Sequence, residues 1–167
     1  MTLTITETPS DFSKVADALK SLAKKQLKIG LPPSAGASRQ TILAIQEHGS
    51  PIAHIPARPV IHPALSSAAA RQAIADGLYA AVDAAWNGDE SAASAALEAA
   101  GKAGADSIRA YIDAGVPPPN SPLTVNGGWF YNRRTKKAVY VRGKGFNHPL
   151  VDTGALYASF DYEVSET

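Results

Sequence analysis

The residues with the clearest chemical precedent lie near the end of the 167-residue chain, in Asp152-Thr153-Gly154, which follows two apolar residues. A carboxylate in this setting can be one half of a pair that shares a proton and activates water. The pair needs a second carboxylate, from another copy of the motif or from a second subunit. Only 15 residues follow Asp152, too few for the flap and the later strand of such a site. We therefore interpret residues 152–154 as a structural turn in which Gly154 adopts the unusual backbone angles, with a dimeric aspartic protease as the alternative.

Metal and nucleophile chemistry has little support in the sequence. The chain has no cysteine, which excludes disulfides, thiolate ligands and cysteine nucleophiles. The four histidines, His48, His54, His62 and His148, form no HExxH pattern. Neither a phosphate-binding loop nor a dinucleotide fingerprint nor a Gly-x-Ser-x-Gly turn occurs. We therefore expect no metal, no cofactor and no enzymatic activity.

The distribution of charge is more informative than the net charge of +1, which argues against bulk binding to nucleic acid or a membrane surface. Residues 115–151 contain no acid and six bases, namely Arg133, Arg134, Lys136, Lys137, Arg142 and Lys144. Trp129, Tyr131 and Tyr140 lie among them, and such a mixture can stack on nucleobases and bind phosphates. A charged hairpin tip is also commonly solvated or in contact with another protein. We favour this second interpretation and keep nucleic acid as the alternative.

Apolar spacing predicts the elements that position these residues. A helix begins at Pro9 with Thr8 as its cap, a strand covers residues 27–31, and a helix capped by Ser38 covers 39–48. The apolar face of the first helix consists of Phe12, Val15, Leu19 and Leu22. Four prolines make residues 50–63 an extended connector.

Two long helices are predicted next, over residues 63–86 and from Asp89 onward, and alanine supplies 20 of the 51 residues 64–114. Small side chains allow the helix axes to approach closely, which favours an antiparallel helical hairpin. The expected apolar stripes are Ile74, Leu78, Ala81, Val82 and Ala85 on the first helix, and Ala93, Leu97, Ala100, Gly104, Ile108 and Tyr111 on the second. Their thin apolar faces need a further layer, which strands can supply.

The remaining patterns predict a β-hairpin over about residues 128–144 and a final strand over 156–164. The predicted fold class is therefore α+β: a small, mostly antiparallel sheet packed against a long alanine-rich helical hairpin, plus an N-terminal helix. At this length we expect a single domain over residues 1–167. No apolar stretch approaches the length of a membrane span, so no membrane partner is expected.

Three segments also support a resemblance when they are taken in order. The first has IQEHGS at residues 45–50 and IPARPVIHPA at 55–64; the second is PNSPLT at 119–124. The third is HPLVDTGAL at 148–156, and it ends in SFDYEV at 159–164. In this order and spacing they resemble the head–tail joining and tail-completion (neck) proteins of long-tailed bacteriophages and prophages. The resemblance covers residues 42–164, with the hairpin of about 128–144 as a local elaboration.

This resemblance implies a structural virion protein: a tail-completion or head–tail connector subunit that forms a ring at the head-proximal end of the tail. It implies a homo-oligomer, a hexameric ring, whose partners are the tail tube, the tail terminator and the head connector or adaptor, with possible DNA contact in the lumen. The expected location is the virion, after assembly in the host cytoplasm. Alternatives are a tail terminator or minor capsid-associated protein and, from another class, a small nucleic-acid-binding protein acting through the hairpin.

Under this resemblance, two segments are expected to contact partners. The predicted interface residues are Arg58, Pro59 and His62 on the connector, and Arg133, Arg134, Lys136, Lys137 and Arg142 on the hairpin. A proline on each side of Arg58 restricts its backbone, so we expect Arg58 to offer a fixed positive charge to a partner protein. Pairing with a carboxylate of the same chain is the equal alternative. Asp152, Thr153 and Gly154 are expected to direct the final strand into the sheet.

Overall fold

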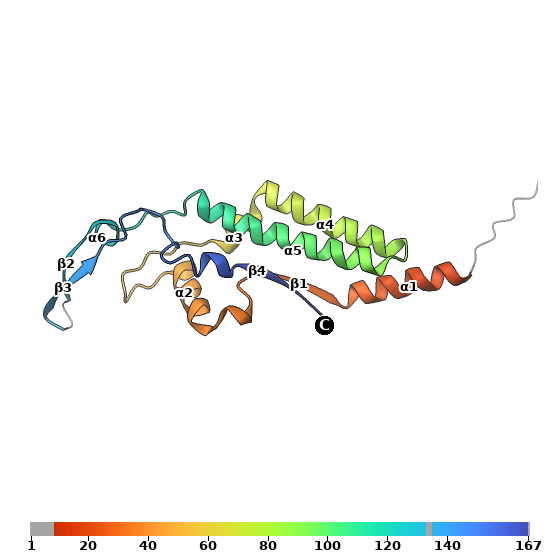
Figure 1. Cartoon of the computed structure of the whole chain (residues 1–167), viewed down its shortest axis with the longest axis horizontal. Helices are drawn as coiled ribbons and strands as arrows, with labels where there is room; N and C mark the ends of the chain where they lie inside the picture. The colour runs from red at the N-terminus through yellow and green to blue at the C-terminus, as the bar shows by residue number, and fades with distance from the viewer. Residues whose placement is uncertain (1–8, 133–134, 167) are drawn as a thin grey trace, which may run out of the picture. The chain divides into compact units, whose positions relative to one another are not determined.

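The computed structural model describes residues 9–132 and 135–166. Its helices are α1 (Pro9–Ala23), α2 (Ala37–His48), α3 (Ile61–Ser66), α4 (Ala68–Trp86), α5 (Glu90–Asp113) and α6 (Pro122–Asn126), with short 3-10 helices η1 (Pro33–Ala35) and η2 (Tyr157–Ser159). Its strands are β1 (Lys25–Gly30), β2 (Gly127–Asn132), β3 (Lys137–Arg142) and β4 (Asp161–Glu166). Figure 1 shows α4 and α5 side by side as a long helical hairpin. The predicted α+β class is confirmed.

The chain divides into two compact units. Unit 1 comprises residues from 1–32, 65–107 and 160–167, and unit 2 comprises residues from 33–64 and 108–159. The chain passes from one unit to the other four times, so neither unit is one continuous piece of sequence. No helix in the described part of either unit is long and apolar enough to cross a membrane.

Close packing of small residues holds α4 against α5 in unit 1. A Cβ atom at Gly77 would lie 2.7 Å from the Ala100 Cβ and 3.0 Å from its Cα, so the two helices approach backbone to backbone. Ala81 and Ala85 are buried accordingly. The predicted stripe on α4 was wrong at Leu78 and Val82, which are exposed, because a contact this close admits only the smallest side chains.

The stripe predicted for α5 is confirmed at five positions. Ala93, Leu97, Ala100, Gly104 and Ile108 are buried. Near the start of α5, Ala93 joins Ala18 of α1 and Ala85 of α4 in one apolar cluster, against which Leu19 and Leu22 pack. Phe12, which was predicted on the same face of α1, is exposed.

The pair β1–β4 supplies the further layer over α5. The strands are antiparallel, with Leu27 opposite Val164 and Ile29 opposite Tyr162. A Cβ atom at Gly101 would lie 2.5 Å from the Tyr162 ring, and one at Gly104 would lie 2.6 Å from the Ile29 Cδ1. The two glycines therefore leave the space into which the strand side chains fit. Beside them, Phe160 is fully buried just before β4.

Unit 2 contains α2, most of α3 (residues 61–64), the end of α5, α6 and the pair β2–β3. Its buried apolar side chains include Leu43 of α2, Val60 before α3, Ile108 and Ile112 of α5, and Val116. The pair β2–β3 is antiparallel and confirms the predicted hairpin. The strands of the protein thus form two separate pairs, where one small sheet was expected, because β1 pairs with β4 and β2 with β3.

Several predicted boundaries differ from the structure. The helix expected over 63–86 is two helices, because Ser67 interrupts it and its side chain accepts a hydrogen bond from the Ala70 N–H at 3.2 Å. The extended connector predicted over 50–63 is wrong at both ends, because residues 51–54 form a turn closed by an antiparallel bridge between Ser50 and Ile55, and α3 begins at Ile61. Only residues 56–60 of this segment lie outside a turn, bridge or helix. Ser38 lies inside α2, whose N-cap is Gly36. Helix α6 was not predicted; Ser121 caps it and Pro122 is its first residue.

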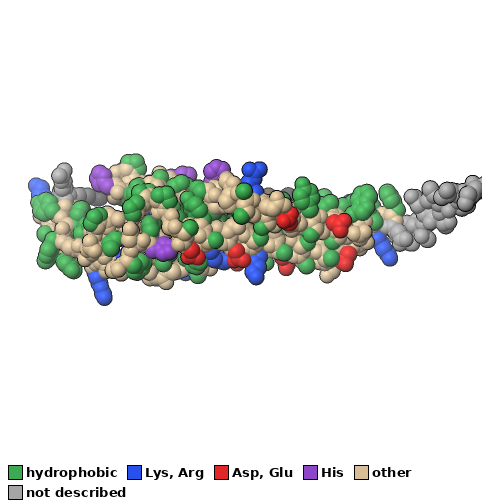
Figure 2. All heavy atoms as spheres, turned by 90° about the horizontal axis from the view of Figure 1, so that it is seen from above, with side chains coloured by type: hydrophobic (Ala, Val, Ile, Leu, Met, Phe, Trp, Pro, Cys, Tyr) green, Lys and Arg blue, Asp and Glu red, His purple; other side chains and the backbone are tan. Residues whose placement is uncertain are grey.

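The final strand begins later than predicted, at Asp161, because residues 157–159 form η2. The predicted cap Thr8 lies outside the described residues. Figure 2 shows that hydrophobic side chains lie on the surface over much of the face in view, and α4 and the hairpin β2–β3 contribute several large ones.

Candidate functional site

Residues 45–64, 119–124 and 148–156, which carry most of the resemblance, come together in unit 2, whereas residues 160–164 belong to unit 1. Arg58 connects the first two of these segments. Its side chain is only 7% exposed. Its Nε donates to the Pro118 carbonyl oxygen at 2.8 Å and its Nη2 donates to the Pro119 carbonyl oxygen at 3.1 Å. A planar guanidinium suits this paired contact because its donors have a fixed spacing. Burial lowers the pKa of Arg58, but a guanidinium stays protonated in proteins.

The end of α2 holds the segment that contains Arg58. Glu47 Oε1 accepts hydrogen bonds from the N–H groups of Val60 at 2.9 Å and Ile61 at 2.8 Å. A Cβ atom at Gly49 would lie 2.8 Å from the Ala57 nitrogen, and Gly49 has φ 73°, so only glycine fits this close backbone contact. The structure therefore gives Glu47 and Gly49 a shared role: they fold the connector back onto α2.

The third segment is tied to the same unit by polar contacts. Asn147 Oδ1 accepts from the Asn120 N–H at 2.9 Å, and a ring nitrogen of His148 lies 2.8 Å from the Ile112 carbonyl oxygen. Lys144 Nζ donates to the His148 carbonyl oxygen at 3.2 Å and to the Val151 carbonyl oxygen. Lys144 therefore fastens the loop that precedes Asp152.

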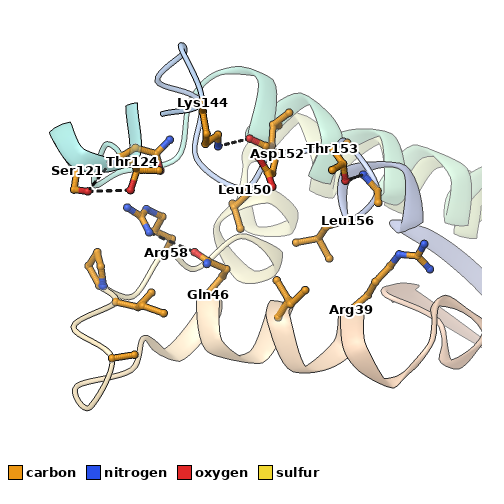
Figure 3. Close-up of a pocket in the computed structure, with 18 of the residues that line it drawn as sticks. Arg39, Gln46, Arg58, Ser121, Thr124, Lys144, Leu150, Asp152, Thr153 and Leu156 are labelled. Carbon is orange, nitrogen blue, oxygen red and sulfur yellow. Dashed lines mark hydrogen bonds between the residues drawn. The ribbon is translucent and has the colours of Figure 1, made fainter. Parts of the chain in front are cut away.

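These segments line a cavity of about 740 Å³ within unit 2. In Figure 3, Arg39, Gln46 and Arg58 lie across it from Lys144, Leu150 and Asp152. Four cationic side chains line it, Arg39, Arg58, Arg142 and Lys144, and among the described lining residues Asp152 is the only acid. The cavity is thus cationic overall, and one chain brings a single carboxylate to it, where acid–base hydrolysis by an aspartate pair needs two.

The segment Asp152-Thr153-Gly154 lies in a bend at the edge of this cavity. Asp152 and Thr153 are exposed, and Gly154 has φ 77°, which glycine adopts without strain. Thr153 Oγ1 accepts a hydrogen bond from the Ala155 N–H at 3.4 Å. The bend leads through η2 into β4.

The hairpin β2–β3 exposes large side chains on both of its faces. Trp129, Tyr131, Tyr140 and Arg142 share one face by strand alternation and register, and Phe130 lies opposite Val139 on the other. Trp129 is 73% and Tyr140 59% exposed, and their rings meet edge to face with centroids 5.6 Å apart. Phe130 and Val139 are also exposed. We call Trp129, Tyr131, Tyr140 and Arg142 the aromatic face of the hairpin.

The base of the hairpin is attached to α6 by backbone contacts. The Lys144 N–H donates to the Thr124 carbonyl oxygen, and the Gly145 N–H donates to the Val125 carbonyl oxygen, both at 2.9 Å. A Cβ atom at Gly127 would lie 2.5 Å from the Gly143 nitrogen, so glycine is needed where the start of β2 lies against the residue that follows β3. The hairpin is therefore held at its base while its two faces are open.

The predicted interface residues fall into different settings. Arg58 is buried and bound within unit 2, whereas Pro59 and His62 are exposed beside it. Lys136, Lys137 and Arg142 are exposed on the hairpin, and Arg133 and Arg134 lie outside the described residues. Of these, Arg58 and Arg142 line the cavity together with Asp152, Thr153 and Gly154. Contact of any of them with a partner stays a prediction.

Two features were not found from the sequence. Glu47 was noted only as part of a motif, and no local pattern indicated that its side chain would accept hydrogen bonds from the Val60 and Ile61 N–H groups. The second is the exposure of large apolar residues on α4, which periodicity alone assigned to the core.

Within residues 9–132 and 135–166, no group of three or more His, Asp or Glu side chains is placed to hold a metal ion. In comparisons with known proteins, the chain matches no family model, and neither a curated protein nor a solved structure shows significant similarity to it.

Proposed function

We propose that this chain is a structural subunit of a long-tailed bacteriophage particle, which acts by association with copies of itself and with other particle proteins. In this proposal it is a tail-completion or head–tail connector subunit, and it forms a ring, hexameric as the resemblance implies, at the head-proximal end of the tail. Its partners are the tail tube, the tail terminator and the head connector. It functions in the virion after assembly in the host cytoplasm.

The observation that carries the proposal is the hairpin β2–β3. An isolated two-stranded hairpin is marginally stable in water, and this pair has no third strand among the described residues. It nevertheless presents Trp129, Tyr140 and Phe130 to solvent. Large contiguous apolar surface at an unpaired sheet edge is typical of a protein–protein contact. We infer that the hairpin is completed by a partner in the assembled particle.

The internal contacts of unit 2 support the same proposal. Each of the segments 45–64, 119–124 and 148–156 is weak as a motif, but the contacts of Glu47, Arg58 and Lys144 make them parts of one folded unit. Residues that hold one unit together are expected to occur together in a sequence pattern. This gives the resemblance a structural basis that is independent of any catalytic group.

The test is to replace residues 133–137 with two glycines and to measure both folding and assembly. The circular dichroism spectrum should be unchanged, because none of the described hairpin residues is buried, while the yield of infectious particles should fall by about tenfold or more. A matched control removes two exposed lysines of unit 1, Lys20→Ser and Lys102→Ser, and should leave the yield unchanged. A normal yield from the hairpin variant would contradict the proposal.

A second candidate function is nucleic-acid binding, favoured by the aromatic face, on which Arg142 lies on the same side of the hairpin as the rings of Trp129 and Tyr140. If it is correct, binding to single-stranded DNA should weaken steeply with salt, with a logarithmic slope of about −0.7 for each phosphate contact. A shallow or absent slope would leave the assembly role as the explanation of this face.

The protease alternative has a separate test. Asp152→Asn would abolish cleavage of any substrate that a dimeric enzyme hydrolyses, because the shared proton of the pair requires both carboxylates. In the structural role, the same change removes only an exposed carboxylate at a bend, so particle yield and stability should stay close to those of the wild type.

A further inference from the structure

The exposed face of α4 carries large apolar side chains that the helical hairpin leaves uncovered. Leu78, Tyr79, Val82 and Trp86 follow one another at spacings of one, three and four residues, which places them on adjoining strips of the same helix face. Tyr79 is 73% and Trp86 66% exposed, although aromatic residues are the ones that gain most from burial. We call these four residues the apolar face of α4.

Acids border this face. Asp76 and Asp83 are exposed, lie three residues before Tyr79 and three residues before Trp86, and belong to a stretch, 72–86, without a lysine or arginine. Asp76 accepts a hydrogen bond from the Gln72 amide at 2.7 Å, which still leaves the carboxylate open to solvent. The face is therefore apolar in its centre and negatively charged along one side.

The aromatic face of the hairpin has the opposite charge. Trp129, Tyr131 and Tyr140 form its apolar part, Arg142 lies on the same face, and Lys136 and Lys137 are exposed at the tip. The two faces are thus both aromatic and apolar, but one is bordered by acids and the other by bases.

The same opposition holds for the whole units. The sequence segments of unit 2 contain nine lysines and arginines and three acids, a formal net charge of +6. Those of unit 1 contain seven lysines and arginines and twelve acids, a formal net charge of −5. The net charge of +1 for the chain therefore conceals a strong division. Complementary charge of this kind steers association and sets its orientation.

We propose that the apolar face of α4 receives the aromatic face of the hairpin from a second copy of this chain. The inference rests on the proposed function, to which it adds the two surfaces that meet between neighbouring subunits. Trp86 and Tyr79 would pack against Trp129 and Tyr140, with Asp76 and Asp83 beside Arg142 and Lys136.

Charge selects this arrangement over contacts between identical surfaces. Two α4 faces brought together would place the acids of both copies next to one another, and two hairpins would do the same with their bases, which is unfavourable at close range. Joining unlike faces brings opposite charges together. A contact between two different surfaces is heterologous, and the resulting complex still has one free surface of each kind at its two ends. Further copies therefore add until a ring closes, provided that the rotation between neighbours permits closure.

The test exchanges the charges of the two faces. Variant H carries Lys136→Glu and Arg142→Glu, and variant A carries Asp76→Lys and Asp83→Lys; all four positions are exposed, so both chains should fold normally. Association is measured by sedimentation of the purified full-length chain. Because close charge pairs across an interface couple strongly, each variant alone should associate about 100-fold more weakly than the wild type.

An equal mixture of H and A should regain association to within about tenfold of the wild type. In the mixture, the acidic hairpin of H meets the basic α4 face of A, and the unchanged hairpin of A meets the unchanged α4 face of H. A contact between identical faces would leave one variant unaffected, because H keeps the wild-type α4 face and A keeps the wild-type hairpin. Weak association of both variants together with rescue in the mixture is therefore expected only when unlike faces meet, and contact with DNA predicts no rescue. The matched control is Glu98→Lys with Glu163→Lys, two exposed acids of unit 1 outside α4, and it should associate as the wild type does.

The outcomes separate this inference from the proposed function. If the wild type forms rings and variant A associates normally, or if the mixture shows no rescue, the α4 contact is overturned while the ring-forming role stands. If the wild type stays a monomer even at about 1 mM, where weak contacts are populated, both are overturned. Weak association of H and of A with rescue in the mixture supports the contact.

Discussion

Two antiparallel pairs of six-residue strands, found in the described part of the chain, differ in their exposure to solvent. In β1–β4, Leu27, Ile29 and Tyr162 alternate with exposed residues and pack onto α5, where Gly101 and Gly104 make room for them. In β2–β3, exposed aromatic residues occupy both faces. The same local structure thus serves as core in one unit and as an exposed surface suited to a partner in the other.

The largest effect on stability is expected at Phe160, the buried residue just before β4. Phe160→Ala removes a fully buried ring just before β4 and leaves a cavity, which should lower the free energy of unfolding by about 3–5 kcal/mol. Urea denaturation followed by circular dichroism measures this change. A loss below about 1 kcal/mol, the size of a typical exposed substitution or less, would show that β1–β4 is not part of the core.

A smaller effect is expected at Arg58, whose side chain holds two segments of unit 2 together. Arg58→Met keeps the length of the side chain but removes the donors that the Pro118 and Pro119 carbonyl oxygens accept from. Loss of these hydrogen bonds from a charged donor should cost about 1.5–3 kcal/mol in the free energy of unfolding, because the accepting prolines are exposed and water can partly replace the donors. Arg58→Lys is the informative companion, because a single ammonium cannot reproduce the paired contact, and it should recover only part of the loss. Full recovery would show that charge alone, and not the planar geometry, matters here.

A substitution at Gly101 of α5, which packs against Tyr162 of β4, should have a smaller effect on stability than the loss of Arg58. Gly101→Ala introduces a Cβ atom 2.5 Å from the Tyr162 ring, so the strand pair must move away from α5 at a cost of about 1–3 kcal/mol. Alanine's better helix propensity offsets about 1 kcal/mol of that cost. Ala99→Ser, at an exposed position of the same helix, is the control and should change the melting temperature little. Stabilisation by Gly101→Ala would mean that the strands do not pack this closely.

The smallest effect on folding is expected in β2–β3. Trp129→Ala should change the free energy of unfolding by no more than about 0.5 kcal/mol, since the side chain is 73% exposed and loses one aromatic contact with Tyr140. Thermal unfolding of the isolated chain measures this, and particle yield measures assembly. A normal particle yield together with a large loss of stability would contradict this role and would assign β2–β3 to the core.

Much of the fold was predictable because it depends on local spacing. The period-two pattern of Leu27, Ile29 and Leu31 indicated β1, and the buried stripe of α5 followed from Ala93, Leu97 and Ala100. The break between α3 and α4 at Ser67 was not predictable, because the spacing of apolar residues is compatible with one helix or two. The late start of β4 was missed for a similar reason, because alternation continues through η2.

The amino-acid order alone specifies the available side-chain chemistry and the turns: no cysteine, one Asp-Thr-Gly bend, a basic hairpin and alanine-rich helices. Which face of α4 is covered depends instead on packing between distant parts of the chain. Because Gly77 lies against Ala100, the alanines point inward and Tyr79 and Trp86 stay outside, although periodicity treats Leu78 and Ala81 alike. Burial depends on how closely a neighbouring element approaches, and that distance is set by contacts between residues far apart in the chain.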